Sequence, residues 1–295
     1  MLPATNVRVS CIVLNWNGWK DTIGCLNALQ GGSYPLFQTI VIDNGSTDDS
    51  VRHIRYAHPD IELIESGENL GFARGNNIGI RKALASGADF VWLLNNDTVP
   101  DCRALATLVQ KAQADNRFGA IASVCYFADS PDKVQAWAGG RVNLWIGYPD
   151  IASSPKEDSW FEWLNATSLL LDRRALEDVG LLDERFFLYW EDVEIGLRLR
   201  KHHWMLAAAP DSRILHKVNA STGGNKAVLT RYTTCSGLRI LRLHSPVPFL
   251  AMFVFVALRF AKRIITCKFA GCRDVWAGIR DYRKQNTNSA GARHS

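Results

Sequence analysis

Short apolar runs alternate with helix-patterned segments in the first hundred residues. The runs span residues 9–14, 39–42 and 90–94, and Asn or Asp follows each of them. Between the runs, residues 19–29, 48–57 and 74–85 carry apolar side chains at helical spacing. This alternation predicts an α/β domain whose mostly parallel sheet is covered by helices on both faces.

Polar residues follow the predicted strands at the point where each strand ends. Ligands of open α/β sheets bind beyond the carboxyl ends of the strands, so this edge is where we expect a site. Asn and Asp also cap helices and form turns, and each position alone fits a structural role equally well. The residues concerned are Asn15, Asn17, Asp43, Asn95, Asn96 and Asp97.

The pattern is less regular between residues 120 and 147. After it we predict a strand over residues 163–171, a helix that begins at Arg173, a helix over residues 191–202 and a short strand that ends at His216. Acidic residues at positions 191, 192 and 194 suit a helix start because the helix dipole favours negative charge there. A carboxylate held beside aromatic side chains is also what a general base requires, and the spacing does not separate the two interpretations.

Asp97 places one carboxylate where a diphosphate could meet it through a divalent cation. Mg²⁺ and Mn²⁺ prefer oxygen ligands and are usually held by one or two carboxylates together with phosphates. His216, at the end of its own predicted strand, could supply a further ligand, and a place in the core is the alternative for this histidine.

Charge is divided unevenly along the chain. Residues 1–215 carry 20 basic and 27 acidic residues, a net charge of −7, whereas residues 216–295 carry 14 basic and 2 acidic residues, a net charge of +12. The basic end predicts an anionic partner. Residues 246–258 form an almost wholly apolar stretch, too short to span a bilayer, and a basic tail with Trp276 and Tyr282 follows.

This stretch and its tail predict a segment that lies in the interface of an anionic membrane, with a buried C-terminal helix as the alternative. The run of aliphatic and aromatic residues argues against nucleic acid, whose binders interleave basic residues with isolated aromatic ones. The seven cysteines are scattered and indicate neither disulfides nor a zinc site. Residues 1–7 lack a signal-peptide pattern, so we expect a cytoplasmic protein that is peripherally associated with the inner face of the membrane.

Ordered sequence blocks carry a resemblance to a known family. They are V-L-N-W-N-G at residues 13–18, V-I-D-N-G-S-T-D at 41–48, N-L-G-F-A-R-G-N-N-I-G at 69–79, L-N-N-D-T at 94–98, and D-E-R-F-F-L-Y at 183–189, which runs into Glu191 and Asp192. Over about residues 8–217 the chain resembles the large family 2 of inverting glycosyltransferases, especially its rhamnosyltransferase-like branch. The resemblance implies the GT-A fold, a Rossmann-like sheet flanked by helices.

The resemblance also implies roles for individual residues. Asp97, at the family's D-x-D position, and His216 are expected to bind a divalent metal, Mg or Mn, and Asp192 is expected to be the catalytic base, with Glu191 as the alternative. The D-x-D position here reads Asn-Asn-Asp, which leaves the metal fewer charges. The expected nucleotide-sugar site contains Asn15, Asn17, Asp43, Ser46, Arg74, Asn77, Asn95 and Asn96, and the expected acceptor side contains Trp163, Tyr189 and Trp190.

The activity implied is the inverting transfer of a sugar to a hydroxyl of a lipid-linked glycan in cell-envelope polysaccharide or O-antigen synthesis. L-rhamnose from dTDP-rhamnose is the favoured donor, with UDP-sugars as alternatives. A polyprenyl-phosphate sugar synthase of the same fold and a non-catalytic nucleotide-sugar-binding protein are the competing hypotheses. We predict a catalytic domain at residues 1–217, with a donor half to about residue 98 and an acceptor half from about residue 99. A helical, membrane-associating region is predicted at residues 218–295.

Overall fold

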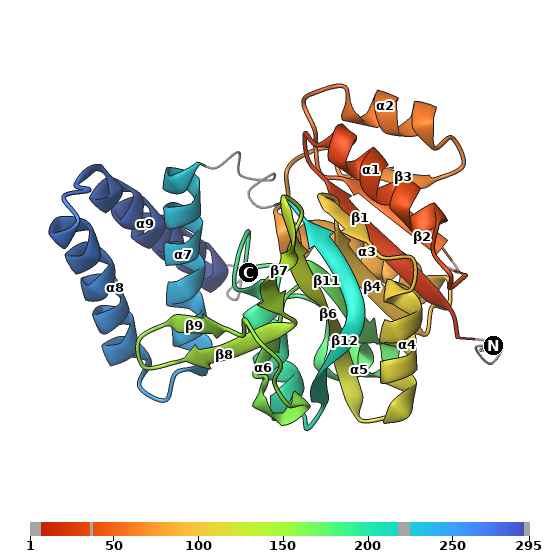
Figure 1. Ribbon diagram of the computed structural model, residues 1–295. Helices are drawn as coiled ribbons and strands as arrows, with labels where there is room; N and C mark the ends of the chain where they lie inside the picture. Colours follow the sequence, from red (N-terminus) through yellow and green to blue (C-terminus); the bar gives the residue numbers. More distant parts are fainter. Residues whose placement is uncertain (1–6, 36–37, 218–224, 292–295) are drawn as a thin grey trace.

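The computed structural model describes residues 7–35, 38–217 and 225–291, and the side chains of these segments as far as residue 286. In this part of the chain, a nine-stranded sheet carries helices on both faces, and a three-stranded sheet lies beside it. Helices α7 (Lys226–His244), α8 (Pro248–Ile265) and α9 (Ala270–Gly291) pack together at one side of the molecule (Figure 1). The predicted absence of a signal peptide concerns residues that lie almost wholly outside the described segments.

The first half of the large sheet is parallel, as the alternating pattern predicts. Its strands lie in the order β3 (Glu62–Glu65), β2 (Gln38–Asp43), β1 (Val9–Asn15), β4 (Phe90–Asn95). Successive side chains of a strand point to opposite faces. Ile12 therefore packs on the face covered by α3 (Phe72–Ala85), and Val13 packs on the face covered by α1 (Trp19–Gln30) and α2 (Ser50–Ala57).

The second half of the sheet is mixed, so the first four strands in this order are the part in which every pair is parallel. Strand β11 (Ser168–Asp172) lies antiparallel between β4 and β6 (Phe118–Phe127). Strand β12 (Met205–His216) runs parallel to β6, and it pairs antiparallel with the short β5 (Thr98–Pro100). Strand β7 (Ser130–Trp137) is antiparallel to β6. Helices α4 (Ala104–Ala114) and α5 (Arg173–Val179) cover this part of the sheet.

The strand predicted over residues 163–171 is two strands. Strand β10 (Trp163–Leu164) pairs with β8 (Gly139–Asn143), which pairs with β9 (Tyr148–Ile151) to complete the small sheet. The chain then turns into β11 through Asn165, whose side-chain oxygen accepts the Thr167 N–H at 2.8 Å. Asn commonly stabilises such a turn by bonding the backbone two residues on. Apolar residues on both sides of Asn165, Thr167 and Ser168 made the segment resemble one continuous strand, so the turn was not predicted.

The C-terminal helices share a hydrophobic core with the preceding part of the chain. Phe186, Trp190 and Val193, around the start of α6 (Glu191–Lys201), pack in one cluster with Leu238 of α7 and Phe255 of α8. The domain boundary proposed after residue 217 stays a prediction. The contacts above connect the predicted catalytic domain with the C-terminal helices. Among the described helices, none combines the length and the apolar character needed to cross a bilayer.

Helix α8 combines the two alternatives considered for residues 246–258. Ala251 and Phe255 are buried against α7, whereas Phe249 and Phe253 are 73% and 72% exposed. The tail is divided in the same way, because Tyr282 is buried and Trp276 is exposed.

Candidate functional site

Asn15 and Asp43 end neighbouring parallel strands and lie side by side in register. Asn15 Nδ2 donates to Asp43 Oδ1 at 2.7 Å. The Ser46 N–H donates to Asp43 Oδ2 at 3.0 Å, and the Ser46 hydroxyl donates to Oδ1 at 2.6 Å. The amide oxygen of Asn17 accepts the Thr47 N–H at 2.7 Å. The structure thus brings four of the predicted nucleotide-site residues into one network at the carboxyl edge of the sheet.

Asn44 has a role that the sequence did not reveal. Its amide oxygen accepts the N–H of Leu70 at 3.0 Å, and its Nδ2 donates to the carbonyl of Gly71 at 3.2 Å. Asn44 therefore ties the end of β2 to the loop that precedes α3. The D-N-G order predicts a turn at this position, but it holds no signal for partners more than twenty residues away.

Helix α3 carries two of the predicted nucleotide-site residues in different settings. Arg74 is more than half exposed, with its Nε 3.9 Å from Glu184 Oε2, so its guanidinium is accessible from the surface. Asn77 is buried, donates to the Leu182 carbonyl at 2.8 Å and accepts the Leu182 N–H at 3.1 Å. These bonds give Asn77 a structural function, and its contact with a nucleotide stays a prediction.

Asp97 and His216 meet across the β5–β12 pair. Asp97 is 4% exposed, its Oδ1 makes no hydrogen bond, and the Nε2 of His216 lies 3.3 Å from that oxygen. On the other side of the ring, Nδ1 lies 2.8 Å from Gln135 Oε1. An amide oxygen only accepts, so Nδ1 donates in this contact, and in the corresponding uncharged tautomer the lone pair is on Nε2.

A lone pair that faces a buried carboxylate oxygen without a hydrogen bond is the arrangement that a cation satisfies. A metal-bound histidine typically donates its other ring N–H to an oxygen, as His216 does toward Gln135. Within the described residues, no group of three or more His, Cys, Asp or Glu side chains could enclose a metal ion. Asp97 and His216 therefore form an open pair, which fits an ion that also takes ligands from a substrate.

The two neighbours of Asp97 in the D-x-D position are held by bonds of their own. The Asn95 N–H donates to the Thr167 carbonyl at 3.0 Å, and Asn96 Nδ2 donates to the Thr22 hydroxyl at 3.0 Å. The Asn96 side chain lies at the same sheet edge as Asn15, because Thr22 also donates to the Asn15 amide oxygen at 2.7 Å, and Asn95 lies in register with Leu14 at the end of β4.

Glu191 and Asp192 form the first turn of α6. The Val193 N–H donates to Asp192 Oδ1 at 2.8 Å, and burial raises the pKa of Asp192 to about 6. Burial, and then repulsion by Asp192, raises the pKa of Glu191 well above its ordinary value. Glu191 Oε2 is buried and makes no hydrogen bond. At neutral pH, Asp192 is thus the more readily ionised acid of the two.

The backbone before these acids is strained. Tyr189 and Trp190 have φ angles of 66° and 74°, in the left-handed region that residues other than glycine rarely adopt. Such conformations persist only where surrounding contacts impose them, and they concentrate at functional sites. Helix α7 supplies two of these contacts, since the Ser236 hydroxyl donates to the Leu188 carbonyl at 3.0 Å and Tyr232 stacks on Phe187 at 4.8 Å. Sequence reasoning missed both residues because it assigned α7 to the membrane-associating region.

A short connection links the acidic pair of α6 to the D-x-D position. The backbone N–H of Ala166 lies close enough to the Asp192 carboxylate to oppose the rise in pKa that burial causes, and the carbonyl of the next residue, Thr167, accepts the Asn95 N–H. Residues 166 and 167 therefore approach both the start of α6 and the end of β4.

The aromatic residues predicted for the acceptor side lie mainly inside the protein. Trp163 is 4% exposed and donates its indole N–H to the Arg141 carbonyl at 3.0 Å, and Trp190 is 6% exposed. Both belong to the core cluster that includes α7 and α8, and the half-buried Tyr189 packs against it. This burial favours a packing role for both tryptophans, and contact with an acceptor stays a prediction for all three residues.

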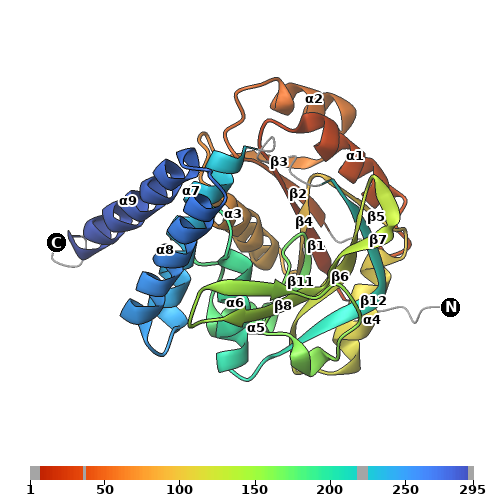
Figure 2. The ribbon, with the colours of Figure 1, turned by 60° about the vertical axis from the view of Figure 1, so that its left-hand side comes forward.

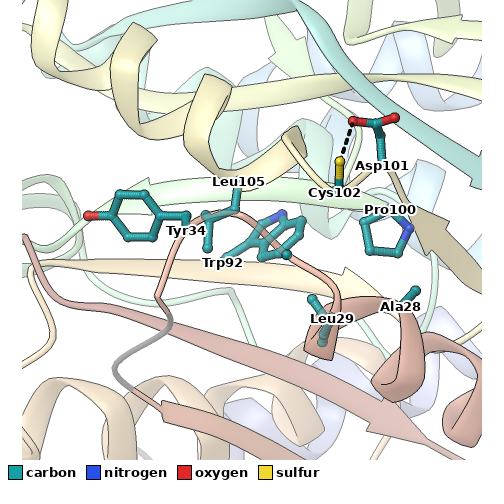
Figure 3. A pocket seen from close by; sticks show the side chains of 9 residues that line it. Ala28, Leu29, Tyr34, Trp92, Pro100, Asp101, Cys102 and Leu105 are labelled. Carbon is teal, nitrogen blue, oxygen red and sulfur yellow. Dashed lines mark hydrogen bonds between the residues drawn. The ribbon is translucent and has the colours of Figure 1, made fainter. Parts of the chain in front are cut away.

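A small pocket lies away from these groups. Its lining comes from the end of α1 and the segment around β5 and α4, and it includes Tyr34, Trp92, Asp101 and Cys102 (Figure 3). None of the predicted site residues lines it. We therefore assign this pocket no role in the candidate site.

Known proteins share the sequence and the fold. The model of the family described as Glycosyl transferase family 2 matches residues 10–161. Over 212 residues the chain is 28% identical to the N-acetylglucosaminyl-diphospho-decaprenol L-rhamnosyltransferase of Mycobacterium tuberculosis, a match that covers 64% of this chain and 69% of the relative. Over 185 residues it is 31% identical to the galactofuranosyltransferase GlfT1 of the same species, covering 60% and 59%.

Among solved structures, the mannosyltransferase PcManGT of Pyrobaculum calidifontis, in complex with GDP-Man and Mn²⁺, superposes with a TM-score of 0.61 at 18% identity. The match covers 98% of this chain and 81% of PcManGT. This likeness shows a common fold and confirms the predicted GT-A architecture. Because the family model spans more than half of the sequence, we conclude that this chain is a glycosyltransferase of family 2.

Proposed function

We propose that the protein transfers a sugar from a nucleotide-sugar donor to a hydroxyl of a lipid-linked glycan, with inversion at the anomeric carbon. The observation that carries this proposal is the connection through residues 166 and 167, which approach both Asp192 and the D-x-D position. A base for the acceptor next to groups that suit a metal and a diphosphate is what a single displacement requires. The work of the enzyme in cell-envelope glycan synthesis is proposed from the relatives named above.

The donor is proposed to be dTDP-L-rhamnose. One relative is named for the transfer of L-rhamnose and for a decaprenol-linked diphosphate sugar, whereas GlfT1 is named for galactofuranose. UDP-linked sugars are therefore the donors to test beside it. The nucleoside would lie against the network of Asn15, Asp43 and Ser46, with Arg74 reaching it from the exposed face of α3.

Asp97 and His216 would hold Mg²⁺ or Mn²⁺ together with oxygens of the donor diphosphate. When bound, the ion would neutralise charge on the departing nucleoside diphosphate. The PcManGT and GalNAc-T7 structures are both described with Mn²⁺, which supports a divalent ion in this fold. Asn95 and Asn96 would line the donor side without adding charge, so Asp97 would be the one carboxylate in the D-x-D position.

Asp192 would act on the acceptor. Its carboxylate would take the proton from the attacking hydroxyl, whose oxygen would bond to the anomeric carbon on the face opposite the leaving diphosphate. The bond between the anomeric carbon and the diphosphate oxygen would break in the same displacement, and the configuration would invert. A base with a pKa of about 6 is ionised at neutral pH and holds a proton better than an ordinary aspartate.

We propose that this reaction takes place at the inner face of the cell membrane, where a lipid-linked acceptor would be presented to a cytoplasmic enzyme. Residues 1–217 would provide the catalytic groups, and residues 218–295 would support them and contact the membrane.

A donor screen tests the proposal. Purified protein is incubated with Mg²⁺ or Mn²⁺, a panel of nucleotide sugars and a polyprenyl-diphosphate-linked acceptor, and nucleoside diphosphate release is measured beside the anomeric configuration of the product. We expect release that depends on both metal and acceptor, with dTDP-rhamnose the best donor. A product formed on a simple polyprenyl phosphate would instead indicate a polyprenyl-phosphate sugar synthase, and a product of retained configuration would contradict the mechanism.

A further inference from the structure

Helix α8 presents an apolar face to solvent along its whole length. Its exposed residues are Phe249, Leu250, Phe253, Ala257, Leu258, Lys262, Ile264 and Ile265, of which only Lys262 is polar. Isolated apolar side chains are ordinary on a protein surface, but a continuous apolar face marks an interaction site. The end of the helix continues it, since Ile265 is 80% exposed and Phe269 is 63% exposed.

The opposite face of α8 is fixed to the protein. Phe255 is buried, and Arg259 donates to the hydroxyls of Thr233 and Thr234 on α7 at 3.0 and 2.8 Å. Arg263 donates to the Thr230 hydroxyl at 3.1 Å. These bonds set the rotation of α8 about its axis, so the apolar face points outward as part of a rigid assembly. They also show that Arg259 and Arg263 have protein partners.

The hairpin between β8 and β9 lies beside α8 and carries two exposed aromatic residues. Its turn lies beside α8 in two views (Figures 1 and 2), and a Cβ at Gly147 would lie 2.7 Å from Phe255 Cδ2. Gly147 has a φ of +64°, which favours glycine in this close contact. Next to it, Trp145 and Tyr148 are 57% and 64% exposed. Trp and Tyr are the residues that membrane interfaces favour.

Charge along α8 and in the segment just after it has one sign. No Asp or Glu occurs from Ser245 to Arg273 in the sequence. Lys262, Lys268 and Arg273 are exposed at the end of α8 and shortly after it. An apolar helical face with aromatic residues and neighbouring cations is the composition of helices that lie on anionic lipid. The core of a protein–protein interface offers no comparable reason for this charge bias.

We propose that the exposed face of α8, together with Trp145 and Tyr148, is a docking surface for an anionic lipid bilayer. The idea that docking serves a lipid-linked acceptor rests on the proposed function, whereas lipid binding itself rests on the exposed residues. Phe255 of α8 and Trp190, next to Glu191 and Asp192, belong to one core cluster. A docked α8 would therefore hold the predicted base at a fixed height above the membrane.

Vesicle sedimentation with the full chain, without donor or acceptor, tests the surface. Wild-type protein is expected to bind vesicles of phosphatidylglycerol and phosphatidylcholine, and to bind phosphatidylcholine alone more weakly. The double variant Phe249→Ser/Phe253→Ser should bind at least about tenfold more weakly, because two rings no longer leave water. Tyr56→Ser is the matched control, since Tyr56 on α2 is an 89% exposed aromatic residue outside the proposed surface.

Two further variants test the hairpin and the charge. Trp145→Ser should weaken binding to both kinds of vesicle. Lys262→Glu/Lys268→Glu should weaken binding to anionic vesicles by roughly tenfold or more and make the remaining binding less sensitive to salt. Point variants suit this test better than removal of residues 246–295, because that deletion would remove Phe255 and expose the core that it covers, including Trp190 and Leu238.

Failure of wild-type protein to bind anionic vesicles, or equal binding by the Phe249 and Phe253 double variant, would overturn the proposal. So would a wild-type dimer in solution that becomes monomeric in the double variant without vesicle binding, since the surface would then belong to a second copy. Sugar transfer to a water-soluble acceptor analogue is measured separately. Its absence, with vesicle binding intact, would count against the proposed function and leave the docking surface in place.

Discussion

Gln135 Oε1 lies 2.8 Å from the Nδ1 of His216, on the side of the ring remote from Asp97. Gln135 belongs to β7 and His216 ends β12, two strands that lie on either side of β6. The contact fixes both the orientation of the imidazole and the ring nitrogen that carries the proton. Gln135 is thus a positioning residue for the predicted metal ligand.

Replacing Gln135 by Leu should weaken Mn²⁺ binding in the presence of nucleoside diphosphate by about 10- to 100-fold, the usual effect of removing such a partner. Calorimetric titration of Mn²⁺ measures this without relying on turnover. In a His216→Ala background the Gln135→Leu change should have no further effect. An equal loss in that background would show that Gln135 acts independently of the histidine.

Replacing Asp97 by Ala should abolish metal-dependent binding of the donor. Asn95 and Asn96 are neutral and cannot replace a buried carboxylate that faces a divalent ion. His216→Ala should have a milder effect, because Asp97 and the donor diphosphate would remain. Donor affinity is measured over a range of Mn²⁺ concentrations. Unchanged affinity in the Asp97 variant, with the same Mn²⁺ dependence, would remove Asp97 from the metal site.

The sequence predicts β1, β2 and β4 well because each is a single buried run next to a helix, whereas the short, half-buried β3 of the same parallel half was not predicted. The turn at residues 165–167 was not predicted, because the apolar residues on either side of it suggest one continuous strand. The roles of Ser236 and Tyr232 were not predicted either, because they depend on contacts with residues more than forty positions earlier. The candidate site was found chiefly through family motifs, and motifs do not extend to α7.

Replacing Ser236 by Ala should lower the turnover number several-fold while donor affinity stays unchanged. The variant loses the hydrogen bond to the Leu188 carbonyl and with it part of the support for the strained Tyr189 and Trp190. Such a buried bond contributes about 1 kcal/mol to stability. Ser212→Ala is the control, because that buried hydroxyl donates to the Ala104 carbonyl at 2.9 Å, away from α6. A similar loss of turnover in both variants would reduce Ser236 to general stability.

Transfer should depend on pH with a midpoint near 6. The base acts in its deprotonated form, so the rate under saturating donor should rise with pH up to about 7 and then level off. Below the midpoint each unit of pH should cost about tenfold. The rate is followed from pH 4.5 to 8.5 with metal in excess. A rate that is flat between pH 5 and 7 would show that Asp192 does not carry the proton in the slow step.

The decisive comparison is between Asp192→Asn and Glu191→Gln, which keep the shape of each side chain and remove its charge. If Asp192 is the base, its variant should transfer sugar about 10² to 10⁴ times more slowly, the usual cost of losing general-base assistance. Donor and metal binding should be nearly normal, because the predicted contacts for both lie elsewhere. Glu191→Gln should retain most activity, since on this hypothesis Glu191 takes no proton from the acceptor and burial already raises its pKa well above the ordinary value.

Stability distinguishes this result from misfolding. Burial raises the pKa of Asp192 above its value in an unfolded chain, so the folded state favours the protonated acid. The folded protein therefore loses stability as the pH rises and Asp192 ionises near pH 6. At pH 7.5 this loss is essentially complete. Asp192→Asn escapes that penalty and should melt at the same or a higher temperature than wild type at pH 7.5. A slow but stable Asp192 variant identifies the base. Modest and equal losses in both variants would leave the acids a role only at the start of α6, and a fully active Asp192→Asn enzyme would contradict the mechanism.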